Sequence, residues 1–205
     1  MNQITSTMNK ILLATLTVAF LACKTEPKEE KPIDYAVFSG TITNAEDDML
    51  KVTGNGLEKE ITLNDDGTFR DTLKIEENGY YTFRLGRERS SMYLTQGSDI
   101  ALSMDAAQFD ESIKYTGEGA TENNYLASKS LALENAMGKT DELFSLEPDA
   151  FEAKLTALKN ELLNHLNENK GLNEEFKKQQ ELDAQYVHLI NLDKYPRYNA
   201  YFTKK

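Results

Sequence analysis

Cysteine is almost absent from this chain, because Cys23 is the single one in 205 residues. One cysteine cannot form an internal disulfide, a CxxC redox pair or a cysteine-rich zinc site. Positive charge is also scarce: 23 Lys and Arg stand against 34 Asp and Glu, a net charge of −11. Such an acidic surface repels phosphate backbones and anionic headgroups, so we expect neither nucleic-acid binding nor electrostatic attachment to a membrane.

Motifs of catalysis are missing as well. No GxSxG, P-loop or GxGxxG segment occurs, and Ser90 and Ser91 have no neighbouring base in the sequence. The two histidines, His165 and His188, lie on different expected helices without an i, i+4 ligand partner, so surface or core-edge positions are expected. We therefore predict no catalytic residue and no cofactor.

Aspartates in turns raise the question of a metal. In a calcium loop with Gly67 in sixth place, Thr62 and Leu73 would occupy positions one and twelve, and neither carries the required carboxylate. Hairpin chemistry explains Asp65 and Asp66 instead. We predict no metal site.

The N-terminus has the form of an export signal. Lys10 precedes a twelve-residue apolar stretch, 11–22, which is too short to span a bilayer. The end Phe20-Leu21-Ala22-Cys23 resembles a bacterial lipobox, so residues 1–22 are expected to be a signal peptide and Cys23 the lipidated residue. The alternative is cleavage nearby, which would leave Cys23 as a free thiol.

A charged tether follows the expected anchor. Residues 23–34 contain KTEPKEEKP, whose mixed charges and prolines exclude a packed element. Lipid chains, at about 0.8 kcal/mol per buried CH₂, would hold such a protein on a membrane. We expect a lipid-anchored protein of the cell envelope, in the outer membrane, and leave its periplasmic or surface face open.

Alternating apolar residues and regularly spaced turns predict an antiparallel β-domain over 35–119. The turns Asp66-Gly67 and Asn78-Gly79 supply residues that tolerate positive φ in tight hairpins. Eight short strands of this kind favour a sandwich or a barrel. Their expected ranges are 35–43, 49–54, 58–64, 68–75, 79–86, 91–95, 99–104 and 112–116.

A change to helical periodicity predicts three helices over 120–194, so the fold class is α+β. Thr121, Pro148 and Asn173 are the expected helix starts. The third helix places Leu182, Tyr186 and Leu189 beside Ile190, and these apolar stripes are expected to be buried. Residues 195–205 read as an aromatic, Pro-broken linker or C-terminal tail.

One basic cluster interrupts the acidic β-domain. Arg84, Arg87 and Arg89, grouped with Lys74, form a candidate site for an anionic ligand. The alternative is a solvated strand face whose cations balance nearby acids.

Several segments together resemble a known family. They are Phe38-Ser39-Gly40-Thr41-Ile42, Asp65-Asp66-Gly67-Thr68-Phe69, Gly79-Tyr80-Tyr81-Thr82-Phe83, and Gly117-Glu118-Gly119-Ala120 followed by Asn123-Asn124-Tyr125-Leu126. Over roughly residues 23–205 the chain is similar to the N-terminal region of Bacteroidota lipoproteins that carry a C-terminal TlpA/ResA-like thioredoxin domain. The resemblance implies a β-domain and helices placed before a thiol–disulfide oxidoreductase domain. Because the CxxC of that domain is missing here, none of the family's catalytic residues transfers to this chain.

Three hypotheses remain from the sequence. The first is a noncatalytic, lipid-anchored envelope module that positions or binds a partner protein, either the N-terminal part of a split or truncated thioredoxin-like protein or a stand-alone descendant. The second is an envelope protein that binds a ligand on the basic face around Arg84, Arg87 and Arg89. The third is an enzyme without a recognisable motif.

Overall fold

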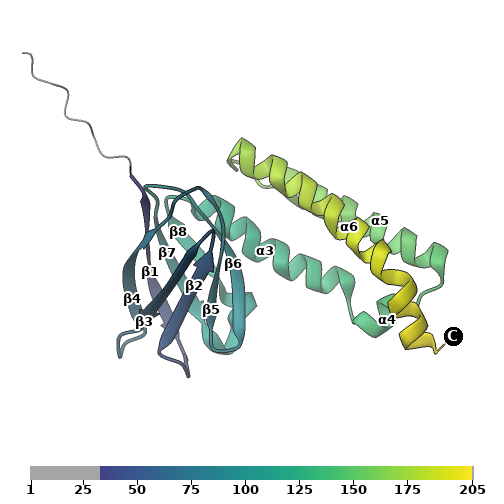
Figure 1. Ribbon diagram of the computed structural model, residues 1–205, viewed down its shortest axis with the longest axis horizontal. Helices are drawn as coiled ribbons and strands as arrows, with labels where there is room; N and C mark the ends of the chain where they lie inside the picture. The colour runs from purple at the N-terminus through teal and green to yellow at the C-terminus, as the bar shows by residue number, and fades with distance from the viewer. Residues whose placement is uncertain (1–32, 205) are drawn as a thin grey trace, which may run out of the picture. The chain divides into compact units, whose positions relative to one another are not determined.

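The computed structural model describes residues 33–204, in which two four-stranded β-sheets are followed by helices (Figure 1). The predicted α+β class is confirmed. Cys23, the expected signal peptide and all but the last two residues of the expected tether lie outside the described residues. The strands are β1 (Tyr35–Thr43), β2 (Met49–Gly54), β3 (Leu57–Thr62), β4 (Thr68–Lys74), β5 (Gly79–Leu85), β6 (Glu88–Leu94), β7 (Asp99–Asp105) and β8 (Lys114–Gly117).

The two sheets have the strand orders β4-β1-β7-β8 and β3-β2-β5-β6 and are not closed into a barrel. The sandwich alternative therefore holds and the barrel alternative is wrong. The predicted antiparallel pairing holds for the described strand pairs with one exception: β1 and β7 pair in parallel, with Val37 opposite Asp99. Parallel neighbours need a long crossover connection. Here the chain between them forms β4 of the same sheet and β2, β3, β5 and β6 of the other sheet.

A core of aromatic and aliphatic side chains joins the sheets. The ring centroid of Phe38 on β1 lies 5.0 Å from that of Phe69 on β4, in an edge-to-face contact. It lies 6.3 Å from the ring centroid of Phe83 on β5 of the opposite sheet. Phe38 and Phe83 are fully buried. Burying a side chain of this size stabilises the fold by about 1.5–3 kcal/mol relative to leaving it exposed, so these contacts hold the two sheets face to face.

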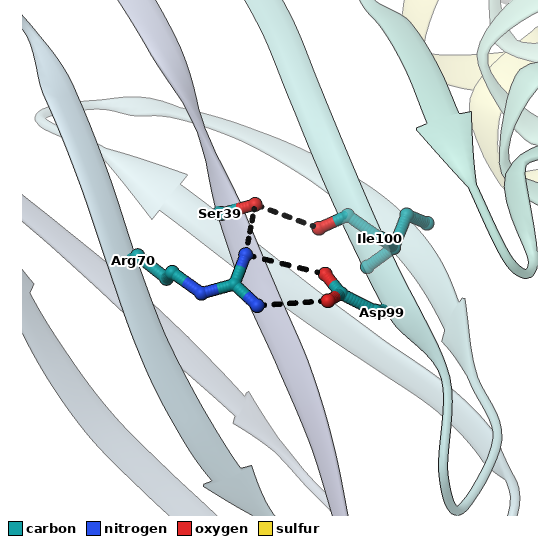
Figure 2. A network of polar contacts seen from close by, with 4 residues as sticks. All are labelled: Ser39, Arg70, Asp99 and Ile100. Atoms are coloured by element: carbon teal, nitrogen blue, oxygen red, sulfur yellow. Dashed lines mark hydrogen bonds and ion pairs between the residues drawn. The ribbon is translucent and has the colours of Figure 1, made fainter.

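On the outer face of the first sheet, Arg70 on β4 reaches across β1 to Asp99 on β7 (Figure 2). Its two terminal nitrogens donate to the two carboxylate oxygens at 2.8 and 3.4 Å. Ser39 on β1 accepts a third, 3.5 Å hydrogen bond from the same guanidinium and donates to the Ile100 carbonyl. Three neighbouring strands are thus linked by one exposed side chain.

Three long helices follow the sheets: α3 (Ala120–Met137), α5 (Pro148–Glu168) and α6 (Glu174–Thr203). Pro148 and Asn173 begin α5 and α6 as predicted, and the Asn173 carboxamide accepts from the Glu175 and Phe176 amides. Thr121 does not cap α3, because Gly119 in the left-handed region occupies that position. Short helical segments were not predicted: η1 (Ala106–Gln108), α2 (Phe109–Ser112) and α4 (Thr140–Phe144).

The C-terminal segment is helical, so the predicted Pro-broken tail at 195–205 is wrong. Helix α6 continues through Pro196 to Thr203. Tertiary contacts hold these turns: Tyr195 Oη donates to the Leu146 carbonyl at 2.6 Å, and Asn199 Nδ2 donates to the Phe144 carbonyl at 2.8 Å. Such contacts offset the backbone hydrogen bond that an internal proline removes.

Helix α3 is fixed to both sheets by two consecutive asparagines. Asn123 accepts from the amide of Tyr93 and donates to its carbonyl, on the edge strand β6, at 2.8 Å each. Asn124 makes the same pair of bonds with Tyr115 on the edge strand β8, at 2.8 and 2.9 Å. The two amides therefore occupy strand edges that would otherwise be open for pairing with another chain.

Within residues 33–204, no helix combines the length and the apolar character needed to cross a bilayer.

Candidate functional site

The candidate site is a groove on the outer face of β5 and β6, where α3 lies beside β6 and the N-terminal part of α6 reaches Tyr80 on β5. It consists of two hollows, each of about 380 Å³, that share Ser91, Leu126 and Lys129. The first, which we call the arginine hollow, is lined by Thr82, Arg89, Ser90, Ser91, Leu126, Lys129, Ser130 and Leu133. The second, the tyrosine hollow, is lined by Tyr80, Ser91, Leu126, Lys129, Gln179, Gln180, Leu182, Asp183 and Tyr186.

Strand register explains why polar side chains face this groove. Thr82 pairs with Ser91, and Arg84 pairs with Arg89, across β5 and β6. Successive residues of a strand alternate between its faces, so the intervening Phe83 enters the core while these four face outward. The β5–β6 hairpin therefore presents hydroxyls and cations to the helices.

A buried polar network crosses the groove. Lys129 on α3 has only 10% of its side chain exposed and forms an ion pair with Asp183 on α6. Its ammonium also donates to Gln180 Oε1 at 2.6 Å, and Gln180 Nε2 donates to the Tyr80 hydroxyl on β5 at 2.7 Å. Burial raises the pKa of Tyr80 to about 12, while the hydrogen bond from Gln180 acts against that rise. The network ties β5, α3 and α6 together.

The three sequence-predicted arginines are exposed, but they do not form one site. Arg89 lines the arginine hollow, and Arg84 lies directly opposite it on β5. Arg87 lies in the β5–β6 turn and lines a different depression, beside Asp47 and Glu88. Lys74 lies on β4 of the other sheet, 3.9 Å from Asp34 in an ion pair, so its grouping with the arginines is wrong.

The structure places one further cation, Lys51, in line with Arg84 and Arg89, and sequence reasoning did not single it out. Lys51 on β2 lies opposite Arg84, which in turn lies opposite Arg89. The ion pair with Glu58 raises the pKa of Lys51, and Arg84 acts in the opposite direction. Period-two alternation could have placed Lys51 on an outward face, but only the strand order brings it beside Arg84.

Helix α6 carries an exposed apolar face beside the tyrosine hollow. Leu182, Tyr186, Leu189 and Ile190 follow i, i+4, i+7 and i+8 spacing and are 48–59% exposed. The expectation that these side chains are buried is wrong. Other positions of α6 make the internal contacts: Phe176, Gln180, Ala184 and Asn191 are its buried residues.

The sequence predicts surface or core-edge positions for both histidines, and both are half-buried. His165 stacks on Tyr125 with 5.4 Å between ring centroids, and its Nε2 is 2.9 Å from Ser128 Oγ. His188 is half-buried on α6, and its Nδ1 has no hydrogen-bond partner among the described residues. In residues 33–204, no group of three His, Cys, Asp or Glu side chains is arranged to hold a metal ion.

Comparison with known proteins adds little to this geometry. No protein-family model matches the chain, and no curated protein matches it. Among solved structures, the chain is similar to a "putative cell adhesion protein" from Bacteroides ovatus ATCC 8483, at 11% sequence identity and a TM-score of 0.27. The similar part covers 42% of this chain and 43% of that one. A likeness of this size carries no argument about fold or function.

Proposed function

We propose that this protein is a noncatalytic, lipid-anchored module of the bacterial cell envelope that binds and positions a partner protein through the exposed face of α6. The observation that carries the proposal is the row Leu182, Tyr186, Leu189 and Ile190, which stays 48–59% exposed while another side of the same helix packs into the fold. Exposed apolar side chains gathered on one face typically mark protein–protein contacts.

The partner that fits this proposal best is a thioredoxin-fold domain containing a CxxC pair. Support comes from the resemblance of the chain to the N-terminal region of TlpA/ResA-like lipoproteins. In that arrangement the β-domain and helices supply the scaffold, and the partner supplies the thiol chemistry. The chain's own single cysteine, Cys23, is assigned to lipid attachment at the outer membrane.

Binding to the partner tests the α6 face. The thioredoxin domain of a TlpA/ResA-like lipoprotein is titrated into the purified chain and followed by calorimetry. Replacing Leu182 and Ile190 by Lys should weaken binding about tenfold or more, because charges would be desolvated at the contact. Ala153→Lys with Ala157→Lys, two exposed positions four residues apart on α5, is the matched control. Equal affinities for both double variants would refute docking on α6.

The anchor and the absence of catalysis are tested separately. Cys23→Ser should move the protein from the membrane fraction to the soluble fraction, and mass spectrometry should find acyl chains on Cys23 of the unsubstituted protein. Continued membrane retention of Cys23→Ser would refute the anchor. The purified chain should reduce insulin no faster than buffer, and any excess rate would overturn the noncatalytic assignment.

A further inference from the structure

We propose that the arginine hollow is a binding site for a small organic anion, a molecule bearing a phosphate or carboxylate group next to hydroxyls. This inference is independent of the docking face on α6. It begins from the hollow's lining, which contains two cations, Arg89 and Lys129, two leucines, the hydroxyl residues Thr82, Ser91 and Ser130, and no carboxylate.

The arginine hollow has no carboxylate in its lining, although the domain around it is strongly acidic. Residues 33–120 contain 8 basic and 17 acidic side chains, a net of −9. Acidic residues nonetheless avoid this hollow, while the neighbouring depression around Arg87 contains Glu46, Asp47 and Glu88. The side chains that line the arginine hollow therefore carry positive charge in a domain that is negative overall, an arrangement that favours an anion there.

Arg89 has unused hydrogen-bonding capacity. In the part of the chain that the structure describes, no carboxylate lies within ion-pair distance of Arg89 or Arg84, although these cations lie opposite each other on β6 and β5. Like charges directly opposite in a strand pair destabilise the sheet. An oxyanion would relieve this repulsion and accept two parallel hydrogen bonds from a guanidinium.

Lys129 supplies a second donor, held in place by its own network. An ammonium has three N–H donors, and two of them are directed to Gln180 and Asp183. No third acceptor for Lys129 is present among residues 33–204, and the side chain lines the hollow. Asp183 neutralises part of this charge from the tyrosine hollow, so Arg89 is expected to contribute more of the attraction.

The hydroxyls and the size indicate more than a bare ion. Thr82, Ser91 and Ser130 can each donate and accept a hydrogen bond, which suits sugar-like hydroxyls as well as an oxyanion. A volume of about 380 Å³ lies within the range of small-molecule sites and exceeds what inorganic phosphate needs. We infer a ligand of monosaccharide size with one anionic group.

The test uses glucose 6-phosphate, glucuronate, inorganic phosphate and glucose as probes in calorimetric titrations of the full chain without its signal peptide. Either glucose 6-phosphate or glucuronate should bind more tightly than inorganic phosphate, and the stronger of the two identifies the anionic group. Glucose should not bind. Binding of no anion at millimolar concentration, or equal binding of glucose, would overturn the proposal.

Two charge-matched variants locate the site. Arg89→Gln should reduce the affinity about tenfold, whereas Arg87→Gln, which removes the same charge from the adjoining turn, should change it less than about twofold. Both arginines are exposed, so both variants are expected to fold, and circular dichroism checks this. Equal losses in the two variants would show nonspecific attraction and overturn the assignment to this hollow.

Discussion

Asn123 on α3 and Tyr93 on β6 exchange two hydrogen bonds of 2.8 Å, so one asparagine side chain satisfies both backbone groups of an edge-strand residue. Asn123 is fully buried, and its Nδ2 also donates to the Gly119 carbonyl at 2.8 Å. The N-terminal part of α3 is thereby held against β6, and Lys129, six residues further along the helix, lines the groove.

Removing this amide should be costly. Asn123→Ala leaves a buried N–H and a buried carbonyl of Tyr93 without partners, at about 1–3 kcal/mol each, so the free energy of unfolding should fall by about 3 kcal/mol. Asn135→Ala, at an exposed position of the same helix, is the control and should change it by less than about 0.5 kcal/mol. Urea unfolding measures both. Similar values for the two variants would contradict this role of Asn123.

Tyr115 offers the opposite case, because its hydroxyl is buried without a hydrogen-bond partner among the described residues. Tyr115→Phe deletes that polar atom and keeps the ring, so the protein should become more stable by about 1 kcal/mol. Tyr81→Phe is the matched control, since the Tyr81 hydroxyl donates to the Glu77 carbonyl at 2.9 Å and its loss should destabilise by about 1 kcal/mol. Thermal unfolding compares them, and a loss of stability in Tyr115→Phe would contradict the account.

Alkaline pH should destabilise the fold through Tyr80. Burial raises the pKa of this phenol from 10.0 to about 12, so the unfolded chain ionises first as pH rises. The contribution is fully present below pH 10 and is lost between pH 10 and about 12. Tyr80→Phe should show a constant stability difference from wild type below pH 10 that narrows above it. A difference that stays constant up to pH 12 would show that Tyr80 does not contribute to the decline.

The C-terminal turns of α6 should depend on Asn199. Asn199→Ala removes hydrogen bonds of 2.8 and 3.2 Å to the Phe144 and Leu146 carbonyls. Because Pro196 weakens the helix there, backbone amides at 197–203 should then exchange with deuterium faster. Lys194→Ala, an exposed neighbour on the same helix, should leave exchange unchanged. Unaltered protection in Asn199→Ala would mean that other contacts hold the segment.

Local chemistry made much of the fold predictable from sequence. Glycine-containing turns set the strand boundaries, and Pro148 and Asn173 begin helices because they suit the first turn in their own right. The parallel pairing of β1 with β7 was not predictable in this way, since it depends on which strands form the other sheet. The continuation of α6 through Pro196 was unpredictable for the same reason. The helix tolerates this proline because Tyr195 and Asn199 bond to carbonyls of a distant segment of the chain.

The candidate site was only partly predictable. Arg89 was singled out because cations are rare in this chain, and the structure places it in the groove. No sequence pattern singles out Lys129, because its burial depends on the tertiary contacts among β5, α3 and α6. The exposed row on α6 was missed because apolar helical spacing indicates a contact face without indicating what covers it.

Photocrosslinking in the living cell tests the central claim, partner docking on α6, most directly. Benzoylphenylalanine replaces Tyr186, which is 59% exposed, or Lys154, an exposed residue of α5, as the control. We predict one prominent adduct from position 186, identified by mass spectrometry as a thioredoxin-fold protein with a CxxC pair, and none from position 154. No adduct at 186, or the same adducts at both positions, would contradict the account.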